Sequence, residues 1–188
     1  MKRSDNLKES KVLLDADGVR RALSRMAREI VEAHGGTERL AIVGIHRGGV
    51  HLARRLCEII AQDEGQRPAE GMIDITLYRD DVLIGLPQPI VGRTELPFEM
   101  DHRRVELIDD VLFTGRTVRS ALDALVDYGR PDCIRLSVLV DRGHRELPIQ
   151  ADIVGARLAT DRNHSVKVEL TETGAPADRV VLYTPEGS

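Results

Sequence analysis

The chain has 188 residues, of which 41% are hydrophobic, and a formal net charge of −4 at pH 7. A chain of this length can bury one good core but not two, so we expect residues 1–188 to form a single domain. The acidic balance excludes bulk electrostatic attraction of nucleic acid, so any RNA contact needs a local basic patch. No apolar run approaches membrane-spanning length, and residues 1–10 lack the apolar core of a signal peptide. We therefore expect a cytoplasmic protein with no membrane partner.

The first predicted element is a helix that begins after Asp15 and runs to His34. Asp15 is a suitable N-cap, and Gly35 with Gly36 forms a typical helix stop. Helical spacing places four apolar residues on one face: Val19, Leu23, Met26 and Ile30. The preceding residues 1–11 are polar, and we expect them to be disordered.

The other side of this helix is basic. At about 100° per residue, four arginines fall within roughly 140° of arc on the side away from the apolar stripe: Arg20, Arg21, Arg25 and Arg28. The spacing leaves two interpretations open. The face is either a solvated surface with Asp17 and Glu32 interspersed, or a surface that binds a polyanion.

A near-continuous apolar run at residues 40–45 predicts a parallel strand that is covered on both faces. His46, Arg47, Gly48 and Gly49 follow it, and a helix is expected from Val50 onward. Glycines let backbone amides approach an anion closely and Arg47 adds charge, so this loop is a candidate phosphate site. The signal is weak alone, because α/β proteins use glycine at such turns routinely.

The next strand is predicted at residues 71–78, and Arg79 follows it. Residues 82–100 contain three prolines and no helical period, and a loop of this length is usually a lid or otherwise functional. Arg79 lies at the base of this loop. It could screen negative charge on a ligand, or pair with Asp80 or Asp81.

The most informative stretch is residues 105–117, VELIDDVLFTGRT. An apolar strand ends in two adjacent carboxylates, Asp109 and Asp110, and the turn from Thr114 to Thr117 opens a helix. Unpaired N–H groups at a helix start carry partial positive charge, so the turn suits a phosphate. Because carboxylates accept hydrogen bonds from hydroxyls, the whole stretch suits a sugar phosphate. The alternative is an ordinary strand-to-helix turn with a capping threonine.

The remaining pattern continues the alternation of strands and helices. The central helix is expected to end at Gly129 and Pro131, and a strand follows at residues 133–140. Short strands are predicted at residues 152–156, 166–170 and 179–183. Such alternation predicts a parallel sheet with helices on both faces and ligands at the carboxyl ends of the strands.

Four segments in this order, residues 74–81, 109–117, 123–131 and 138–149, resemble the bifunctional pyrimidine operon attenuation regulators and uracil phosphoribosyltransferases, the PyrR family. The resemblance covers residues 12 to 168 or so and implies a type I phosphoribosyltransferase fold. In that α/β fold, helices flank a central, mainly parallel sheet, with a small hood and a mobile loop at residues 82–100 that closes over the active site.

The resemblance implies two activities. One is synthesis of UMP and pyrophosphate from uracil and phosphoribosyl pyrophosphate (PRPP). The other is binding to an RNA hairpin in the leader of pyrimidine operon transcripts, in response to uridine nucleotides such as UMP and UTP. A plain salvage transferase for uracil or another base, without RNA binding, is the alternative. Mg2+ is the implied cofactor, held mainly through the substrate diphosphate without dedicated protein ligands. A homo-oligomer is expected, and DNA is not an expected partner.

The resemblance also assigns residues to these tasks. Asp109 and Asp110 would act in catalysis by holding the ribose hydroxyls, and Arg79 would screen the pyrophosphate. PRPP or UMP would contact His46, Arg47, Gly48, Val111, Leu112, Phe113, Thr114, Gly115, Arg116 and Thr117. Uracil would meet Arg142 and backbone groups up to Val166. RNA would be bound by Arg20, Arg21, Ser24, Arg25, Arg28, Arg142, His144 and Arg145.

The chain departs from the resemblance at three places. Phe113 stands where hypoxanthine-guanine enzymes have an aspartate, which weakens a purine assignment. Arg47, Gly48 and Gly49 replace the usual Thr-Arg-Gly, so the pyrophosphate loop is expected to be reshaped. Residues 155–161 lack a lysine and a proline that the family has beside the uracil pocket, which could alter rate, base preference or RNA affinity. We expect His144 to be structural or to face RNA, rather than to act as a general base.

Overall fold

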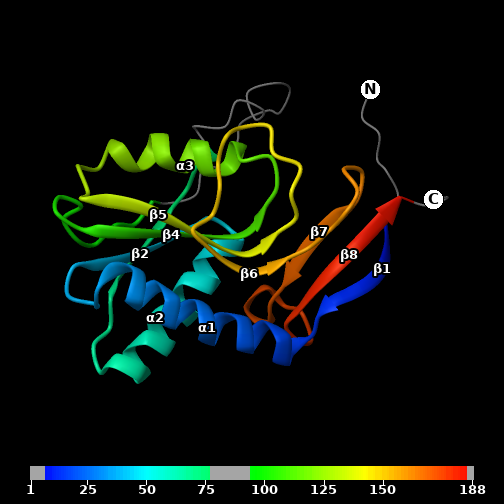
Figure 1. The fold of residues 1–188 in the computed structure, drawn as a ribbon, viewed down its shortest axis with the longest axis horizontal. Coiled ribbons are helices and arrows are strands. Elements are labelled where there is room, and N and C mark those ends of the chain that lie inside the picture. The colour runs from blue at the N-terminus through cyan, green and yellow to red at the C-terminus, as the bar shows by residue number, and fades with distance from the viewer. Residues whose placement is uncertain (1–6, 77–93, 186–188) are drawn as a thin grey trace.

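The structure is a computed structural model that describes residues 7–76 and 94–185. These residues form a parallel sheet of five strands and an antiparallel sheet of three strands (Figure 1). The large sheet has the order β3-β2-β4-β5-β6, and the small sheet has the order β1-β8-β7. The predicted α/β class with a mainly parallel sheet is therefore confirmed.

The strands of the large sheet are β2 (Leu40–Ile45), β3 (Ala69–Ile73), β4 (Arg104–Leu112), β5 (Cys133–Asp141) and β6 (Ile153–Arg157). Those of the small sheet are β1 (Leu7–Leu14), β7 (Ser165–Glu169) and β8 (Arg179–Pro185). The helices are α1 (Ala16–His34), α2 (Gly48–Glu64) and α3 (Arg116–Val126), with a short 3-10 helix, η2, at Thr171–Thr173.

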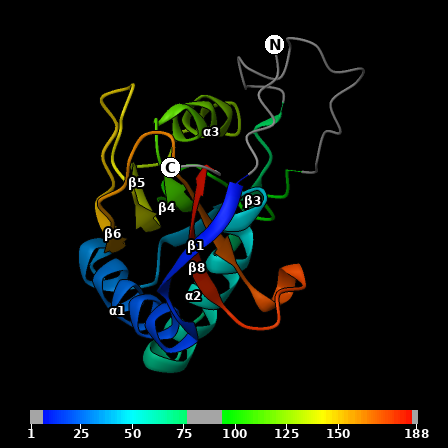
Figure 2. The same cartoon turned by 90° about the vertical axis from the view of Figure 1, so that its right-hand side faces the viewer.

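Helices cover both faces of the large sheet, with α1 and α2 on one side and α3 on the other (Figure 2). Alternate side chains of β2 pack into two hydrophobic cores, one on each face of the sheet. Leu40 and Ile42 pack in the core that contains α1 and α2, whereas Ala41 and Val43 pack in the core that contains α3. All residues of β2 are buried, which explains its unbroken apolar sequence.

Both ends of α1 are capped as the sequence predicts. The side chain of Asp15 accepts a hydrogen bond from the Gly18 N–H at 2.7 Å, and Gly35 adopts a left-handed conformation with φ of 67°. The predicted apolar face is buried: Val19, Leu23, Met26 and Ile30. Within the described residues, no helix is long and apolar enough to cross a membrane.

The expectation of disorder over residues 1–11 is wrong for Leu7 onward. Leu7–Leu14 forms β1, which pairs antiparallel with β8 and aligns Val12 with Val181. Most of its side chains are exposed, so its order comes from backbone hydrogen bonds and not from an apolar pattern. Residues 1–6 lie outside the described part of the chain.

The strand predicted at residues 71–78 is also corrected, because β3 spans Ala69–Ile73. The Asp74 carboxylate accepts a hydrogen bond from the Thr76 N–H at 2.6 Å, a local turn that competes with further strand pairing. Arg79 and residues 82–93 of the predicted loop lie outside the described residues. In the rest of that loop, Glu95 forms an antiparallel bridge with Met72.

Candidate functional site

The two predicted carboxylates lie near the carboxyl end of β4. Asp109 is buried, and its carboxylate accepts a hydrogen bond from the Asp110 N–H at 2.9 Å. The Asp110 carboxylate accepts one from the Val111 N–H at 2.7 Å. Parallel strands end at this edge of the sheet, which is where α/β proteins bind ligands.

Burial makes it costly to ionise both of these side chains. Burial, with the Asp110 carboxylate beside it, raises the pKa of Asp109 well above its usual range. Burial also raises the pKa of Asp110, although the hydrogen bond from Val111 N–H opposes that shift. A ligand that brings hydroxyl donors or positive charge would relieve this cost, so the pair is suited to such a ligand.

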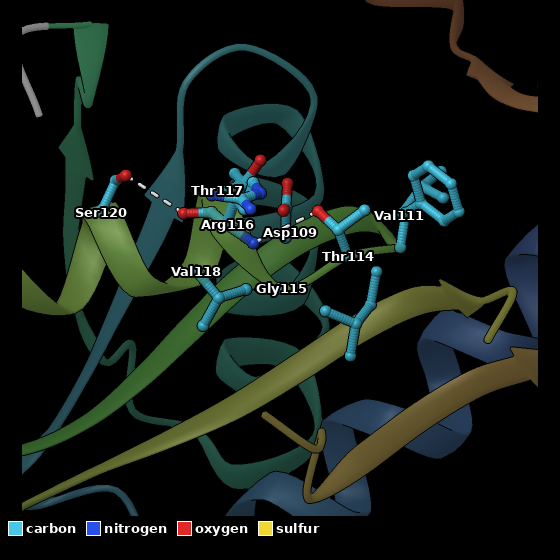
Figure 3. Close-up of a pocket in the computed structure, with 10 residues that line it drawn as sticks. Asp109, Val111, Thr114, Gly115, Arg116, Thr117, Val118 and Ser120 are labelled. Carbon is cyan, nitrogen blue, oxygen red and sulfur yellow. Dashed lines mark hydrogen bonds between the residues drawn. The ribbon is translucent and has the colours of Figure 1, made fainter. Parts of the chain in front are cut away.

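A cavity of about 340 Å³ lies next to Asp109, at the start of α3 (Figure 3). Gly115 is the N-cap of α3, with φ of 92°, and the hydroxyl of Thr114 accepts a hydrogen bond from the Arg116 N–H at 3.4 Å. The cavity is lined by Asp109, Val111, Leu112, Phe113, Thr114, Gly115, Arg116, Thr117, Val118 and Ser120. The start of α3 therefore borders a cavity with a carboxylate in its wall, an arrangement that suits a sugar phosphate.

The second predicted phosphate loop reaches the same carboxylates. His46 and Arg47 are exposed after β2, and α2 begins at Gly48. A β-carbon on Gly48 would fall 2.2 Å from Oδ2 of Asp110, and one on Gly49 would fall 2.2 Å from the carbonyl oxygen of Ile108. Gly49 meets backbone atoms, so only glycine permits this approach of α2 to β4, whereas a β-carbon on Gly48 would displace the Asp110 side chain.

The loop after β5 braces the turn from Thr114 to Thr117. The N–H groups of Glu146 and Leu147 donate to the carbonyl oxygen of Thr114 at 2.9 and 3.2 Å. The Arg116 side chain donates to the Glu146 carboxylate at 2.9 Å. Glu146 and Ser120, which were not among the predicted site residues, therefore contact or line the site. Helical spacing could have indicated Ser120, because it follows Arg116 by one turn and donates to its carbonyl oxygen at 3.1 Å.

Arg145 holds the same loop together. Its side chain donates to the carbonyl oxygens of Phe113 at 3.0 Å and Ile149 at 2.9 Å, and lies 2.7 Å from the Asp141 carboxylate. These contacts occupy the guanidinium that the family resemblance assigns to RNA. In this conformation Arg145 links the loop after β5 to the backbone at Phe113, just before the turn from Thr114 to Thr117.

The family resemblance also assigns Arg142 to RNA, yet this side chain is buried. It donates to the carbonyl oxygens of Asp161 and His164, each at 2.8 Å, and lies over the Phe113 ring. A buried guanidinium with these bonds cannot reach a polyanion, so the RNA assignment of Arg142 does not fit this conformation. Its assignment beside the base pocket is compatible, through Phe113.

His144, which the resemblance assigns to RNA, and Val166, which it assigns to the uracil pocket, both make contacts within the protein. The ring nitrogen Nε2 of His144 lies 2.6 Å from the carbonyl oxygen of Thr160, a contact that joins two loops. The side chain of Val166 is buried in the core that contains α1. Only the backbone of Val166 therefore remains a candidate for contact with a base.

Acidic residues neutralise part of the arginine face of α1. Arg20 pairs with Asp17 at 3.0 Å, Arg25 with Glu29 at 2.7 Å, and Arg28 with Asp63 at 3.9 Å. The hydrogen bond from Arg20 lowers the pKa of the Asp17 carboxylate.

Arg25 has a further role, because it donates to the carbonyl oxygens of Val154 at 3.0 Å and Gly155 at 2.6 Å. It therefore ties α1 to β6. Arg21 is exposed and Ser24 is half-buried. The five predicted residues share one side of α1, but they differ in how free they are to meet a ligand.

The chain matches known proteins over almost its whole length. Residues 10–172 match the model of the phosphoribosyl transferase domain. A Bifunctional protein PyrR from Deinococcus radiodurans is 55% identical over 174 residues, which cover 93% of this chain and 94% of the relative. The protein of the same name from Thermus aquaticus is 53% identical over 176 residues, covering 94% and 97% of the two chains.

Solved structures share the fold at low sequence identity. The hypoxanthine phosphoribosyltransferase of Trypanosoma cruzi superposes with a TM-score of 0.71 at 18% identity, covering 95% of this chain and 98% of that one. The hypoxanthine phosphoribosyltransferase of Staphylococcus aureus gives a TM-score of 0.70 at 18% identity, covering 95% and 94%.

Proposed function

The chain belongs to the PyrR family of phosphoribosyltransferases, RNA-binding regulators that also have uracil phosphoribosyltransferase activity. From that premise we propose which of its residues act in catalysis and which bind RNA. The observation that carries the catalytic half is the meeting of three elements. Asp109 and Asp110, the start of α3 and the start of α2 come together at the carboxyl end of β4.

The roles follow from the chemistry of the transfer. Displacement of pyrophosphate from C1′ of the ribose builds positive charge on the sugar ring, and carboxylates next to the sugar stabilise that charge. Asp109 and Asp110 accept hydrogen bonds from the ribose hydroxyls. The backbone of Gly115 to Thr117 and the Thr114 hydroxyl bind the 5′-phosphate, which anchors the sugar and supplies binding energy remote from the reacting carbon. His46, Arg47 and Gly48 meet the pyrophosphate.

The residues present suit a magnesium ion that arrives with the substrate. Within the described part of the chain, no group of three or more His, Cys, Asp or Glu side chains could hold a metal ion. Mg2+ commonly binds through one or two carboxylates together with substrate phosphates, and Asp109 and Asp110 are the carboxylates at this site. When bound to the diphosphate, the ion would supply neutralisation of the departing pyrophosphate.

The RNA half of the function uses the exposed side of α1. Arg21 and Arg28 lie there with Ser24, and a basic patch of this kind is what an acidic chain needs to bind a polyanion. UMP and UTP carry the ribose and 5′-phosphate of the transferase product, so they occupy the catalytic site and compete with PRPP. RNA affinity then depends on nucleotide occupancy by linkage. We place this activity in the cytoplasm, in a homo-oligomer, with RNA and not DNA as the nucleic-acid partner.

Incubation of the wild-type protein with PRPP, Mg2+ and a panel of bases tests the transferase. Uracil should be converted to UMP, and Asp110→Asn should lower that rate while the protein stays folded by circular dichroism. Turnover of other bases in preference to uracil would favour the plain salvage enzyme. UMP formation at the wild-type rate by Asp110→Asn would refute the role of the carboxylate.

A further inference from the structure

Phe113 is one of two phenylalanines in the chain, and it lines the cavity next to Asp109 and the start of α3. Its carbonyl oxygen accepts a hydrogen bond from Arg145 at 3.0 Å, so its backbone is held from the loop after β5. Phe113 therefore lines the same cavity as the residues that we propose to bind the sugar phosphate.

One face of the Phe113 ring is covered by Arg142. The guanidinium carbon of Arg142 lies 4.1 Å from the ring centroid, within the range of a cation–π interaction. The Arg142 side chain is buried, and its two bonds to the carbonyl oxygens of Asp161 and His164 fix the guanidinium plane. Moving the guanidinium off the ring would break those bonds and leave buried donors unpaired, so the bonds stabilise its position over the ring.

His144 restrains the same ring from another direction. Its ring centroid lies 6.1 Å from that of Phe113, with an interplanar angle of 74°, an edge-to-face arrangement that aromatic pairs favour. His144 is itself held, because Nε2 lies 2.6 Å from the carbonyl oxygen of Thr160. These contacts fix the orientation of the Phe113 ring, and Phe113 is one of the residues that line the cavity.

We propose that Phe113 selects the base by stacking on a single-ring pyrimidine and by filling the space that a two-ring purine would need. This proposal rests on the transferase function proposed above. Truncation to alanine removes a six-membered ring from the cavity wall, which is more than the five-membered ring by which a purine exceeds a pyrimidine. Arg142 is a positioning residue: it touches the Phe113 ring and sets its place, and it acts on the base only through that ring.

The test compares kcat and KM for uracil and for hypoxanthine in five proteins: wild type, Phe113→Ala, Phe113→Leu, Phe98→Ala and Arg142→Lys. In Phe113→Ala the KM for uracil should rise about tenfold, since base–aromatic stacking contributes on that order. Turnover of hypoxanthine should become measurable. Phe113→Leu keeps apolar bulk without an aromatic face, so it should raise the KM for uracil and still reject hypoxanthine.

Phe98 provides a matched control, because it too lies beneath an arginine, with Arg103 5.8 Å from its centroid, but it does not line the cavity. Phe98→Ala should keep the wild-type ratio of the two bases. Arg142→Lys should raise the KM for uracil with little change in kcat at saturating uracil, whereas general misfolding would lower the amount of active enzyme and hence kcat.

Two outcomes separate this proposal from the function on which it rests. If wild type forms UMP but Phe113→Ala keeps the wild-type KM for uracil and still rejects hypoxanthine, the selection role of Phe113 is refuted and the transferase assignment stands. If wild type forms no UMP from uracil and PRPP, the transferase assignment fails and this proposal fails with it.

Discussion

Gly48 and Asp110 lie so close that a β-carbon on the glycine would fall 2.2 Å from Oδ2 of the aspartate and 2.5 Å from its carboxyl carbon. The two residues belong to different elements, α2 and β4. The absence of a side chain at residue 48 lets the loop that we propose to bind pyrophosphate meet the acidic pair. The proposed sites for the pyrophosphate and the ribose of PRPP are thereby coupled through one tight contact.

Gly48→Ala should therefore lower UMP formation by about a hundredfold, since a displacement of about 1 Å at a reacting group can cost that much. The added methyl group must push the Asp110 carboxylate out of its place. The measurement is kcat with saturating PRPP and uracil.

Gly65→Ala is the matched control for this substitution. Gly65 has φ of 72° and open space around its would-be β-carbon, so alanine there should cost about 1 kcal/mol of stability through backbone strain. Its kcat should stay at the wild-type value. Equal losses of kcat in the two variants would show that Gly48 acts through stability and not through Asp110.

Asp109→Asn should make the protein more stable at neutral pH while it lowers turnover. Because burial raises the pKa of Asp109, the folded state holds its proton to higher pH than the unfolded state does. The carboxylate therefore costs stability as pH rises from the ordinary aspartate value through the folded pKa, and asparagine avoids this cost. We expect a gain of about 1 kcal/mol at pH 7.

The stability gained by Asp109→Asn should depend on pH. The difference in melting temperature between Asp109→Asn and wild type should shrink as the pH falls, because the wild-type carboxyl group is then protonated in the folded protein. A variant that is less stable than wild type at pH 7 would show that the Asp109 carboxylate stabilises the fold.

The exposed arginines of α1 should govern the salt dependence of RNA binding. Arg28 is 75% exposed and its contact with Asp63 spans 3.9 Å, so both it and the exposed Arg21 are free to meet phosphates. Replacing both with glutamine should flatten the slope of log affinity against log salt by about one to two units. The measurement is a titration of a uridine-nucleotide-dependent hairpin at 50 to 200 mM salt.

Arg119→Gln serves as the control for charge alone. Arg119 is an exposed arginine on α3 that pairs with Asp123 at 2.8 Å, and it lies off the arginine face. This variant should keep the wild-type slope. If the double variant of α1 also keeps it, the helix is a solvated face and the RNA contact lies elsewhere.

Much of the architecture is readable from local sequence. The caps of α1, the buried β2 and the junction of β4 with α3 are each specified by residues within a few positions of one another, such as Asp15 for the helix start. β1 is different, because its exposed, charged residues become ordered through pairing with β8 at the other end of the chain. No local pattern could reveal that pairing.

The candidate site divides in the same way. One continuous sequence motif predicts both Asp109 and the turn from Thr114 to Thr117. The positions of Arg142 and Arg145 depend instead on contacts with distant carbonyl oxygens. The family resemblance assigns both to RNA binding and Arg142 also to the uracil pocket. The fold uses them instead to hold the loop after β5 and the Phe113 ring.

The central claim is that one site serves both catalysis and control of RNA binding, and Thr114→Ala tests it most directly. Thr114 lines the cavity, and its hydroxyl accepts the Arg116 N–H at the start of α3, so its loss should weaken UMP binding. The decisive measurement is the affinity for a cognate RNA hairpin with and without UMP, in wild type and in Thr114→Ala. We predict that UMP strengthens RNA binding by wild type, and that the variant binds RNA with the nucleotide-free affinity at UMP concentrations that saturate wild type. Undiminished stimulation by UMP in a variant that no longer binds UMP at this cavity would contradict the shared site.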